Sequence, residues 1–336
     1  MARSIKVERI MMKFTLLAAS LLASIGIAQA EEDDVLLFSS FRNDGETGLH
    51  LAYSDDGLTW MALNNGDSFL RPQVGSKLMR DPCIIKGPDG KYHMVWTTGW
   101  WENNIGIAHS DDLVNWSEQT MLPVMAHEED VLNSWAPEIF YDEENSEYII
   151  FWSSAVPGTF PETEDRGDIR STLGIGINHR IYYVKTKDFE TYTDTQLFYD
   201  GGFVSIDASL LRDGDRYIMV VKDETKRPEP EKNIRIAIAA DAQGPYGPAS
   251  PPFSPEGVWV EGPTATKIDD EFYVYYDAYM EHRMMGARSK DLIHWEDVSD
   301  RLTFPEGSRH GTVLKIDSEI LEGLKAVDED AMAAEE

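Results

Sequence analysis

The sequence predicts an all-β fold: a five-bladed β-propeller whose ring is closed by pairing the C-terminal strand with the N-terminal blade. Three observations support this prediction. A unit of short strands and turns recurs along the chain, its opening and closing segments recur in the same order, and no helical period interrupts residues 35–316. Repeated four-stranded sheets are typical of blades that surround a central channel.

The clearest copy of the unit spans residues 79–116. Its strands are short and are separated by Gly, Pro, Asn and Asp, which is typical of an antiparallel sheet. The opening segment recurs at residues 81–84, 136–139, 207–210, 262–265 and 310–313. The closing turn with its aromatic residue recurs at residues 54–60, 110–116, 186–192, 244–247 (a degenerate copy) and 289–295.

The two ends of the chain are expected to complete the first blade. The N-terminal copy starts with outer strands at 35–41 and 49–54, whereas an orphan opening strand lies at 311–316. Pairing these segments would close the ring and leave no long unpaired edge. We therefore expect the propeller domain over residues 31–316, followed by an acidic tail over 317–336 that is frayed or weakly helical.

The first thirty residues resemble a secretory signal peptide. A basic start is followed by an apolar run at 14–28 and by the small-residue site Ala28-Gln29-Ala30. The alternative, a buried first helix, fits this order of features less well. We expect residues 1–30 to be removed and the remaining protein to be secreted or periplasmic.

The charge of the chain limits the classes of molecule that it is expected to bind. Its formal net charge is −30 at pH 7, which disfavours nucleic acid and anionic membranes. The same field disfavours long-range attraction of a highly sulfated or uronate-rich polymer, although a local basic pocket could still hold one anionic sugar. Cys83 is the only cysteine, so an internal disulfide is excluded, and its apolar strand indicates a buried, inert thiol.

Propeller geometry would bring distant carboxylates together, because the first strand of every blade lines the channel. The starts of these strands carry Asp81, Asp207 and Glu261, which we expect at equivalent positions around one channel mouth. Glu138 lies further into its strand and is expected deeper, in a structural role. Two carboxylates beside a sugar bond can serve as the acid and the base of glycoside hydrolysis. Taken alone, Asp81 could equally be a turn residue before proline.

Aromatic residues near this mouth would offer flat apolar surfaces that stack on sugar rings, with core packing as the alternative. They are Trp100, Trp101, Trp135 and Tyr279. Loops 99–104, 157–180 and 223–233 are expected to wall the site. Alternation along an extended strand predicts that Arg80 points away from Asp81.

Three cations, Lys226, Arg227 and Arg235, lie in or near the last of these loops. They would contact an anionic or hydroxyl-rich substrate, or they are solvated charges that offset the acidic surface. We expect no convergent cluster of Arg, Lys and His of the kind that binds phosphate.

Five motifs resemble, in order, those of glycoside hydrolase family 43. They are Arg80-Asp81-Pro82, Trp135-Ala136-Pro137-Glu138, Ile206-Asp207-Ala208-Ser209-Leu210, Glu261-Gly262-Pro263 and Arg309-His310-Gly311. The resemblance implies a five-bladed enzyme that cleaves arabinofuranosides, xylosides and sometimes galactosides with inversion. It implies Asp81 as general base, Glu261 as general acid, and Asp207 as the residue that orients the acid and raises its pKa. The long loop 157–180 departs from the family pattern.

The resemblance also bears on metal binding. His310 matches a channel histidine that in many family members binds calcium directly or through water; the alternative is a hydrogen-bonded core histidine. We expect no required cofactor, and a structural calcium ion in the channel is the one metal that the resemblance suggests.

These observations favour a secreted, exo-acting, inverting glycoside hydrolase that removes a terminal α-L-arabinofuranose or β-D-xylose from plant or algal oligosaccharides or polysaccharides. An exo-galactosidase, an inverting glycoside phosphorylase and a non-catalytic sugar-binding propeller are the alternatives. The expected partner is a carbohydrate, with no nucleic acid and no membrane once the signal is removed. A monomer is the default oligomeric state.

Overall fold

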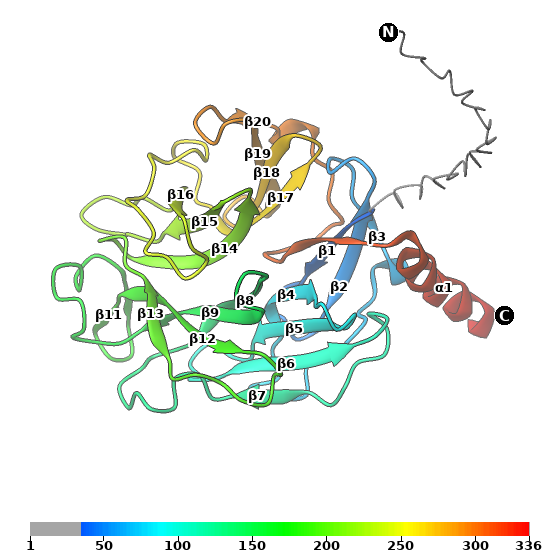
Figure 1. The fold of residues 1–336 in the computed structure, drawn as a ribbon, viewed down its shortest axis with the longest axis horizontal. Coiled ribbons are helices and arrows are strands. Elements are labelled where there is room, and N and C mark those ends of the chain that lie inside the picture. Colours follow the sequence, from blue (N-terminus) through cyan, green and yellow to red (C-terminus); the bar gives the residue numbers. More distant parts are fainter. Residues whose placement is uncertain (1–34, 336) are drawn as a thin grey trace, which may run out of the picture. The chain divides into compact units, whose positions relative to one another are not determined.

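A computed structural model of the chain describes residues 35–335 and their side chains as far as residue 327. Five β-sheets lie around a common centre, which confirms the predicted five-bladed propeller (Figure 1). The proposed signal peptide at residues 1–30 lies outside the described residues. Among residues 35–335, no helix has both the length and the apolar character needed to cross a membrane.

The strands follow one another from blade to blade, and each is antiparallel to its neighbour. The first blade contains β21 (Val313–Ile316), β1 (Val35–Ser40), β2 (His50–Ser54) and β3 (Met61–Ala62). The second contains β4 (Arg80–Lys86), β5 (Tyr92–Thr97), β6 (Ile105–Ser110) and β7 (Thr120–Leu122). The third contains β8 (Trp135–Asp142), β9 (Glu147–Ala155), β12 (His179–Thr186) and β13 (Gln196–Tyr199). The fourth contains β14 (Ser205–Asp213), β15 (Arg216–Asp223) and β16 (Asn233–Ala239), and the fifth β17 (Glu261–Ile268), β18 (Glu271–Ala278), β19 (Arg283–Ser289) and β20 (Glu296–Asp297).

Ring closure follows the predicted route. Strand β21 pairs antiparallel with β1, with Val35 opposite Ile316 and Phe38 opposite Val313. The first blade is therefore built from both ends of the described chain.

The fourth blade differs from the prediction because it has three strands instead of four. The degenerate copy at residues 244–247 forms no strand, and residues 240–260 follow the blade edge irregularly, with single backbone hydrogen bonds such as Ser250 N to Ile236 O at 2.7 Å. Five prolines in this segment lack an N–H group, so a continuous ladder cannot form there.

The recurring turn has a clear physical basis. In the second blade the hydroxyl of Ser110 accepts the N–H of Leu113 at 2.8 Å, and a carboxylate oxygen of Asp112 accepts the N–H of Asn115 at 2.7 Å. Side chains thus satisfy backbone donors at the point where the chain leaves the third strand. The same pattern occurs at Ser54, Thr186 and Ser289, which explains the repeat in the sequence.

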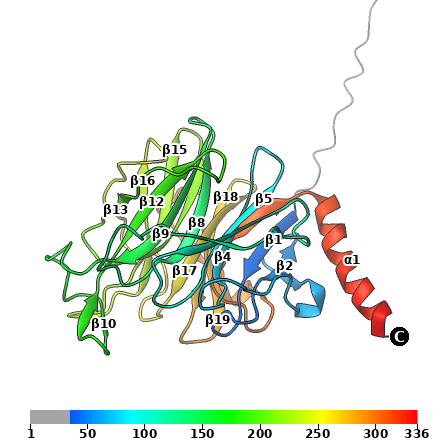
Figure 2. The same cartoon turned by 90° about the horizontal axis from the view of Figure 1, so that it is seen from below.

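Of the two predictions for the C-terminal segment, a frayed or a weakly helical tail, the structure shows the helical one. The segment forms helix α1 (Ser318–Glu335), which lies against the first blade in both views (Figures 1 and 2). Leu321 and Leu324 are buried in the same apolar cluster as Leu37 and Leu51. Their spacing of three residues puts both on one helix face, and burial of that face holds the helix on the blade.

A β-bulge marks the first strand of the second to fifth blades. The strand pairing shifts register after Arg80, Trp135, Ile206 and Glu261. The residue that follows each of them has a left-handed backbone, with φ between 46° and 58°; these residues are Asp81, Ala136, Asp207 and Gly262. Bulges redirect side chains at the rims of sheets, so this repeated feature decides which groups face the channel.

Candidate active site

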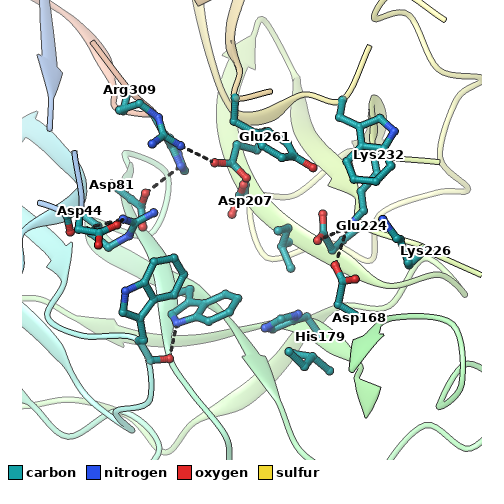
Figure 3. Close-up of a pocket in the computed structure, with 18 residues that line it drawn as sticks. Asp44, Asp81, Asp168, His179, Asp207, Glu224, Lys226, Lys232, Glu261 and Arg309 are labelled. Atoms are coloured by element: carbon teal, nitrogen blue, oxygen red, sulfur yellow. Dashed lines mark hydrogen bonds and ion pairs between the residues drawn. The ribbon is translucent and has the colours of Figure 1, made fainter. Parts of the chain in front are cut away.

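The starts of the first strands surround a cavity of about 440 Å³ at the channel mouth (Figure 3). Asp81, Asp207, Glu261 and His310 all line it, although they come from four different blades and lie far apart in sequence. The propeller therefore brings the predicted acidic residues to one site.

The three acids are not at equivalent positions, and this corrects the expectation from sequence. Asp81 and Asp207 occupy the left-handed bulge position of their strands, whereas Glu261 precedes it by one residue and Gly262 takes its place. Asp81 and Asp207 are 8% and 6% exposed. The side chain of Glu261 is 22% exposed, so it reaches further into the open cavity than the two aspartates.

The bulge also overturns the prediction for Arg80. Strict alternation would send Arg80 away from Asp81, but the left-handed backbone of Asp81 (φ 52°) breaks the alternation, and both residues line the cavity. The Arg80 guanidinium lies 4.2 Å from the centre of the Trp100 ring and 3.5 Å from a carboxylate oxygen of Asp44. Its charge is one of the influences that lower the pKa of Asp81.

Asp81 is held as a carboxylate. Its Oδ1 atom is 3.1 Å from Nδ1 of His310, and its Oδ2 atom accepts a hydrogen bond from the Thr97 hydroxyl at 2.8 Å. Burial favours the neutral acid, but the charge and hydrogen bond of His310, with smaller contributions from Arg80 and Thr97, outweigh it and lower the pKa of Asp81 to about 2. A carboxylate that stays ionised at all ordinary pH values is suited to accept a proton.

Asp207 lies in a different environment. Its backbone N–H donates to the Ser153 hydroxyl at 3.0 Å, and its Oδ2 atom accepts the backbone N–H of Gly262 at 3.0 Å. Burial is the largest cause that raises the pKa of Asp207, to about 6, against the opposing charge of His310. Asp81 and Asp207 thus occupy equivalent bulge positions but have different pKa values, about 2 and about 6.

Glu261 contacts two cations. One carboxylate oxygen is 3.2 Å from Nη2 of Arg309, and the other is 3.3 Å from Nζ of Lys222. Arg309 in turn donates to the fully buried Asp277 at 2.5 Å. These contacts fix the direction of the Glu261 side chain, which a proton donor needs.

His310 was expected as a metal ligand or a core histidine. It is buried, and the charges and hydrogen bond of Asp81, aided by Asp207 and Glu138, raise its pKa to about 9 despite the opposing effect of burial. An imidazole with that pKa carries a proton on both nitrogens at neutral pH and cannot ligate a metal directly. Within the described residues there is no cluster of three or more His, Cys, Asp and Glu side chains arranged for a metal ion. These residues supply no set of direct ligands for a metal ion at His310, and calcium held through water stays a prediction.

Glu138 lies deeper and does not line the cavity. It is 6% exposed and accepts hydrogen bonds from the hydroxyl of Thr312 at 3.0 Å and the thiol of Cys83 at 3.4 Å. Burial raises its pKa to about 7, with His310 as the main opposing charge. Cys83 is buried as expected, and burial raises the pKa of its thiol.

Three of the four predicted aromatic residues line the cavity: Trp100, Trp135 and Tyr279. The indole N–H of Trp135 donates to the backbone oxygen of Trp100 at 2.8 Å, which braces the two rings edge to face. Trp101 does not line this cavity; the guanidinium of Arg170 lies 3.9 Å from the centre of its ring.

The long insertion at residues 157–180 contributes directly to the site. It contains the hairpin β10 (Asp168–Arg170) and β11 (Ile175–Ile177), and Asp168 and Ile177 line the cavity. Of the three cations near loop 223–233, Lys226 lines the cavity. Arg227 instead binds backbone oxygens of the insertion, and Arg235 pairs with Asp223 and Glu231.

Four cations, Arg80, Lys226, Lys232 and Arg309, line the cavity together, which corrects the expectation that none would converge. Lys222, Asp277 and Arg309 also bear on the site through Glu261, although they are not among the site residues predicted from the sequence. A signal was available for two of them: Lys222 and Asp277 each follow an apolar run near the end of a second strand, in register with Ile206 and Glu261. A buried charge at the end of such a strand requires a partner across the channel mouth.

A five-bladed propeller whose carboxylates meet in one such cavity has the groups that acid–base cleavage of a glycosidic bond requires. The family follows from comparison with known proteins. A family model related to glycoside hydrolase family 43 and described as "Probable glycosyl hydrolase domain" matches residues 34–322, and the chain belongs to this family.

Individual relatives are distant. The chain is 24% identical over 271 residues to an alpha-L-arabinofuranosidase of Bifidobacterium longum. The aligned region covers 70% of this chain and 25% of that protein. The chain thus spans about a quarter of the length of that curated relative. The crystal structure of a xylan beta-1,4-xylosidase from Bacillus halodurans is similar in fold, with a TM-score of 0.50 at 21% identity over 68% of this chain and 42% of that one.

Proposed function

We propose that the protein is an exo-acting, inverting glycosidase that removes a terminal pentose, with Asp81 as general base, Glu261 as general acid and Asp207 as the group that orients the acid. The observation that carries the proposal is that Asp81 differs from the neighbouring acids Asp207 and Glu261 in its environment. Asp81 has a pKa of about 2, while Asp207, with a pKa of about 6, and the more exposed Glu261 line the same cavity. Carboxyl groups with different environments in one site are typical of acid–base pairs.

The reaction follows from these positions. Asp81 takes a proton from a water molecule, and the water oxygen forms a bond to the anomeric carbon as the glycosidic bond breaks. Glu261 gives its proton to the departing oxygen, so the released sugar has the opposite anomeric configuration. Asp207 accepts a hydrogen bond from the backbone N–H of Gly262, the residue after Glu261, so it is placed to orient the acid.

The substrate proposal rests on similarity and on shape. The arabinofuranosidase relative supports α-L-arabinofuranose as the terminal sugar. The family resemblance of the sequence motifs supports β-D-xylose as the alternative. The insertion hairpin and the aromatic residues wall the cavity, and a walled cavity accepts the end of a glycan chain more readily than its middle. The signal-like residues 1–30 support secretion or a periplasmic location.

The test is a panel of 4-nitrophenyl glycosides: α-L-arabinofuranoside, β-D-xyloside and β-D-galactoside, with the anomer of the first product followed by NMR. We expect hydrolysis of a pentoside with inversion. Retention of configuration would overturn the assigned roles, and galactoside-only turnover would replace the pentose proposal. The four cations in the cavity favour a second candidate, a phosphorylase; cleavage that requires inorganic phosphate and yields a sugar phosphate would select it.

A further inference from the structure

One side of the cavity carries an unusual set of side chains. Asp168, Glu224, Lys226, Lys232 and His179 lie together on it, opposite the side that holds Asp44 and Asp81 (Figure 3). The general acid candidate Glu261 lies between the two sides. None of the five side chains has a role in the bond cleavage proposed above.

Two lysines here are neutralised. Lys232 lies 2.9 Å from Asp168 and also pairs with Glu224, and Lys222 lies 2.5 Å from Glu224 and 3.3 Å from Glu261. Both ammonium groups are almost fully buried, and a buried charge of this kind needs such partners. Neither lysine is left with charge to offer a ligand.

Lys226 differs from its neighbours. Its ammonium lies 3.7 Å from the centre of the Trp259 ring, and no carboxylate within the described part of the chain forms an ion pair with it. A ring face orients a cation without neutralising its charge. Its backbone N–H is bonded to the oxygen of Arg166 at 2.7 Å, so the insertion loop holds this residue in position independently of its side chain.

His179 offers a second unused donor. The Asn133 oxygen accepts the Ala155 N–H at 3.1 Å, which turns the Asn133 amide nitrogen toward Nε2 of His179 at 2.9 Å. Nε2 is therefore the acceptor, and the proton of the neutral ring is on Nδ1. Burial lowers the pKa of His179 to about 3, so the ring is neutral. The buried Nδ1 atom has no hydrogen-bond partner within the described residues.

Lys226 and His179 line one cavity; the Lys226 ammonium forms no ion pair within the described residues, and the buried Nδ1–H of His179 is a donor without a partner there. We propose that this side of the cavity binds the anionic substituent, a carboxylate or a sulfate ester, of an acidic sugar in the substrate. The inference deepens the proposed glycosidase function and rests on it for the identity of the cavity as a sugar site. Trp100, Trp135 and Ile177 in the same cavity supply apolar surface for the sugar ring, which a free inorganic anion would not use.

A local site of this kind is compatible with the net charge of −30. That field repels an extended polyanion at long range, but screening limits its reach to about 8–10 Å in ordinary salt, whereas a cation inside a cavity acts at contact. We therefore expect a single acidic sugar, or one acidic residue in a mostly neutral chain, to be the ligand.

The experiment measures binding separately from hydrolysis. Calorimetry on the full chain compares D-galacturonic acid, D-galactose 6-sulfate and neutral D-galactose, which share a ring and differ in charge. Inorganic phosphate is a fourth probe. The proteins are the wild type, Lys226→Met, the charge-retaining Lys226→Arg, and Lys77→Met as a control at an exposed lysine outside the cavity. Because the side chain of Lys226 carries no structural hydrogen bond, the variants are expected to melt as the wild type does.

At least one acidic sugar is expected to bind more tightly than galactose, and Lys226→Met to weaken it about tenfold or more, while the binding of galactose is unchanged. Lys226→Arg and Lys77→Met should retain tight binding. Which acidic sugar binds identifies carboxylate or sulfate as the group recognised. Equal affinity for acidic and neutral sugars, an equal loss for both in Lys226→Met, or binding of phosphate alone would overturn the proposal.

Hydrolysis of the aryl pentosides is measured on the same preparations. Turnover of a pentoside without preference for any acidic sugar would leave the proposed function standing and reject this inference. Tight binding of an acidic sugar without any pentoside turnover would support the anion site and reject the pentosidase assignment.

Discussion

The Nδ1 atom of His310 lies 3.1 Å from Oδ1 of Asp81, and the two residues come from opposite ends of the described chain. The contact moves both pKa values, that of Asp81 to about 2 and that of His310 to about 9. A buried ion pair of this kind stabilises each charge with the other. It also ties closure of the ring, which brings β21 beside β1, to the ionisation of the proposed general base.

The first prediction concerns stability against pH. The pKa of His310 is raised on folding, so its contribution is fully present below pH 6.5 and is lost as the pH rises through about 9. Between these values the free energy of unfolding of the wild type should fall by up to about 3 kcal/mol more than that of His310→Gln. Urea unfolding at intervals from pH 6 to pH 9.5 measures it. Parallel curves for the two proteins would contradict the ion pair.

At the acidic end the same contact predicts the opposite trend. The pKa of Asp81 is lowered on folding, so its contribution is present above pH 3.8 and is lost as the pH falls toward 2. Asp207 and Glu138 have raised pKa values, about 6 and about 7, and work against stability as they ionise.

The second prediction tests the general base. Asp81→Asn removes the proton acceptor but keeps its shape, so kcat on the best aryl glycoside should fall about 10²- to 10⁴-fold. Circular dichroism and the melting curve should show a folded protein. Asp215→Asn, at an exposed turn outside the cavity, is the matched control and should keep full activity. Near-wild-type kcat in Asp81→Asn would remove Asp81 from the mechanism.

The third prediction tests the general acid through the leaving group. Glu261→Gln cannot donate a proton, so glycosides of phenol should lose far more activity than those of 2,4-dinitrophenol, which departs without protonation. We expect the two losses in kcat/KM to differ by about tenfold or more. Glu229→Gln, at an exposed position, should change neither rate. Equal losses for both leaving groups would mean that Glu261 holds the substrate and does not donate the proton.

The sequence predicted the propeller well because its signals are local and repeated. The turn formed by Ser110 and Asp112 depends on neighbouring residues, so it leaves the same pattern in the sequence wherever it occurs. The pairing of β21 with β1 follows from the number of strands that each end of the chain contributes. The prediction of four strands for the fourth blade was wrong. Its turn motif at residues 244–247 is present, but the prolines around it prevent the last strand.

The site was predicted less completely, since its side chains depend on the bulge. Glu261 precedes the bulge position that Asp81 occupies in its own strand, and the register shift at the bulge turns Arg80 into the cavity. Period-two reasoning cannot anticipate that shift from one sequence. The partners of Glu261, Lys222 and Arg309, come from other blades, and only the closed ring brings them to it.

The fourth prediction concerns metal removal. Because His310 is protonated and paired with Asp81, and calcium prefers six to eight oxygen ligands, we expect no dependence on a divalent ion. Dialysis against EDTA should leave the melting temperature and kcat unchanged. A fall in either that calcium restores would show that the channel rearranges to take the ion.

The last prediction uses Gly262, whose backbone N–H binds Asp207 and whose φ is 58°. A Cβ atom there would lie 2.1 Å from the His310 ring, whereas a Cβ atom at Gly257, with φ 80°, would meet nothing within 4 Å. Both alanine variants bear the cost of a left-handed backbone, about 1–2 kcal/mol, but only Gly262→Ala must also displace His310. Its melting temperature should therefore fall several degrees below that of Gly257→Ala, and its kcat should fall as well, because the displaced ring no longer holds Asp81. Equal melting temperatures and full activity in both variants would mean that the His310 ring is free to move and does not fix the proposed base.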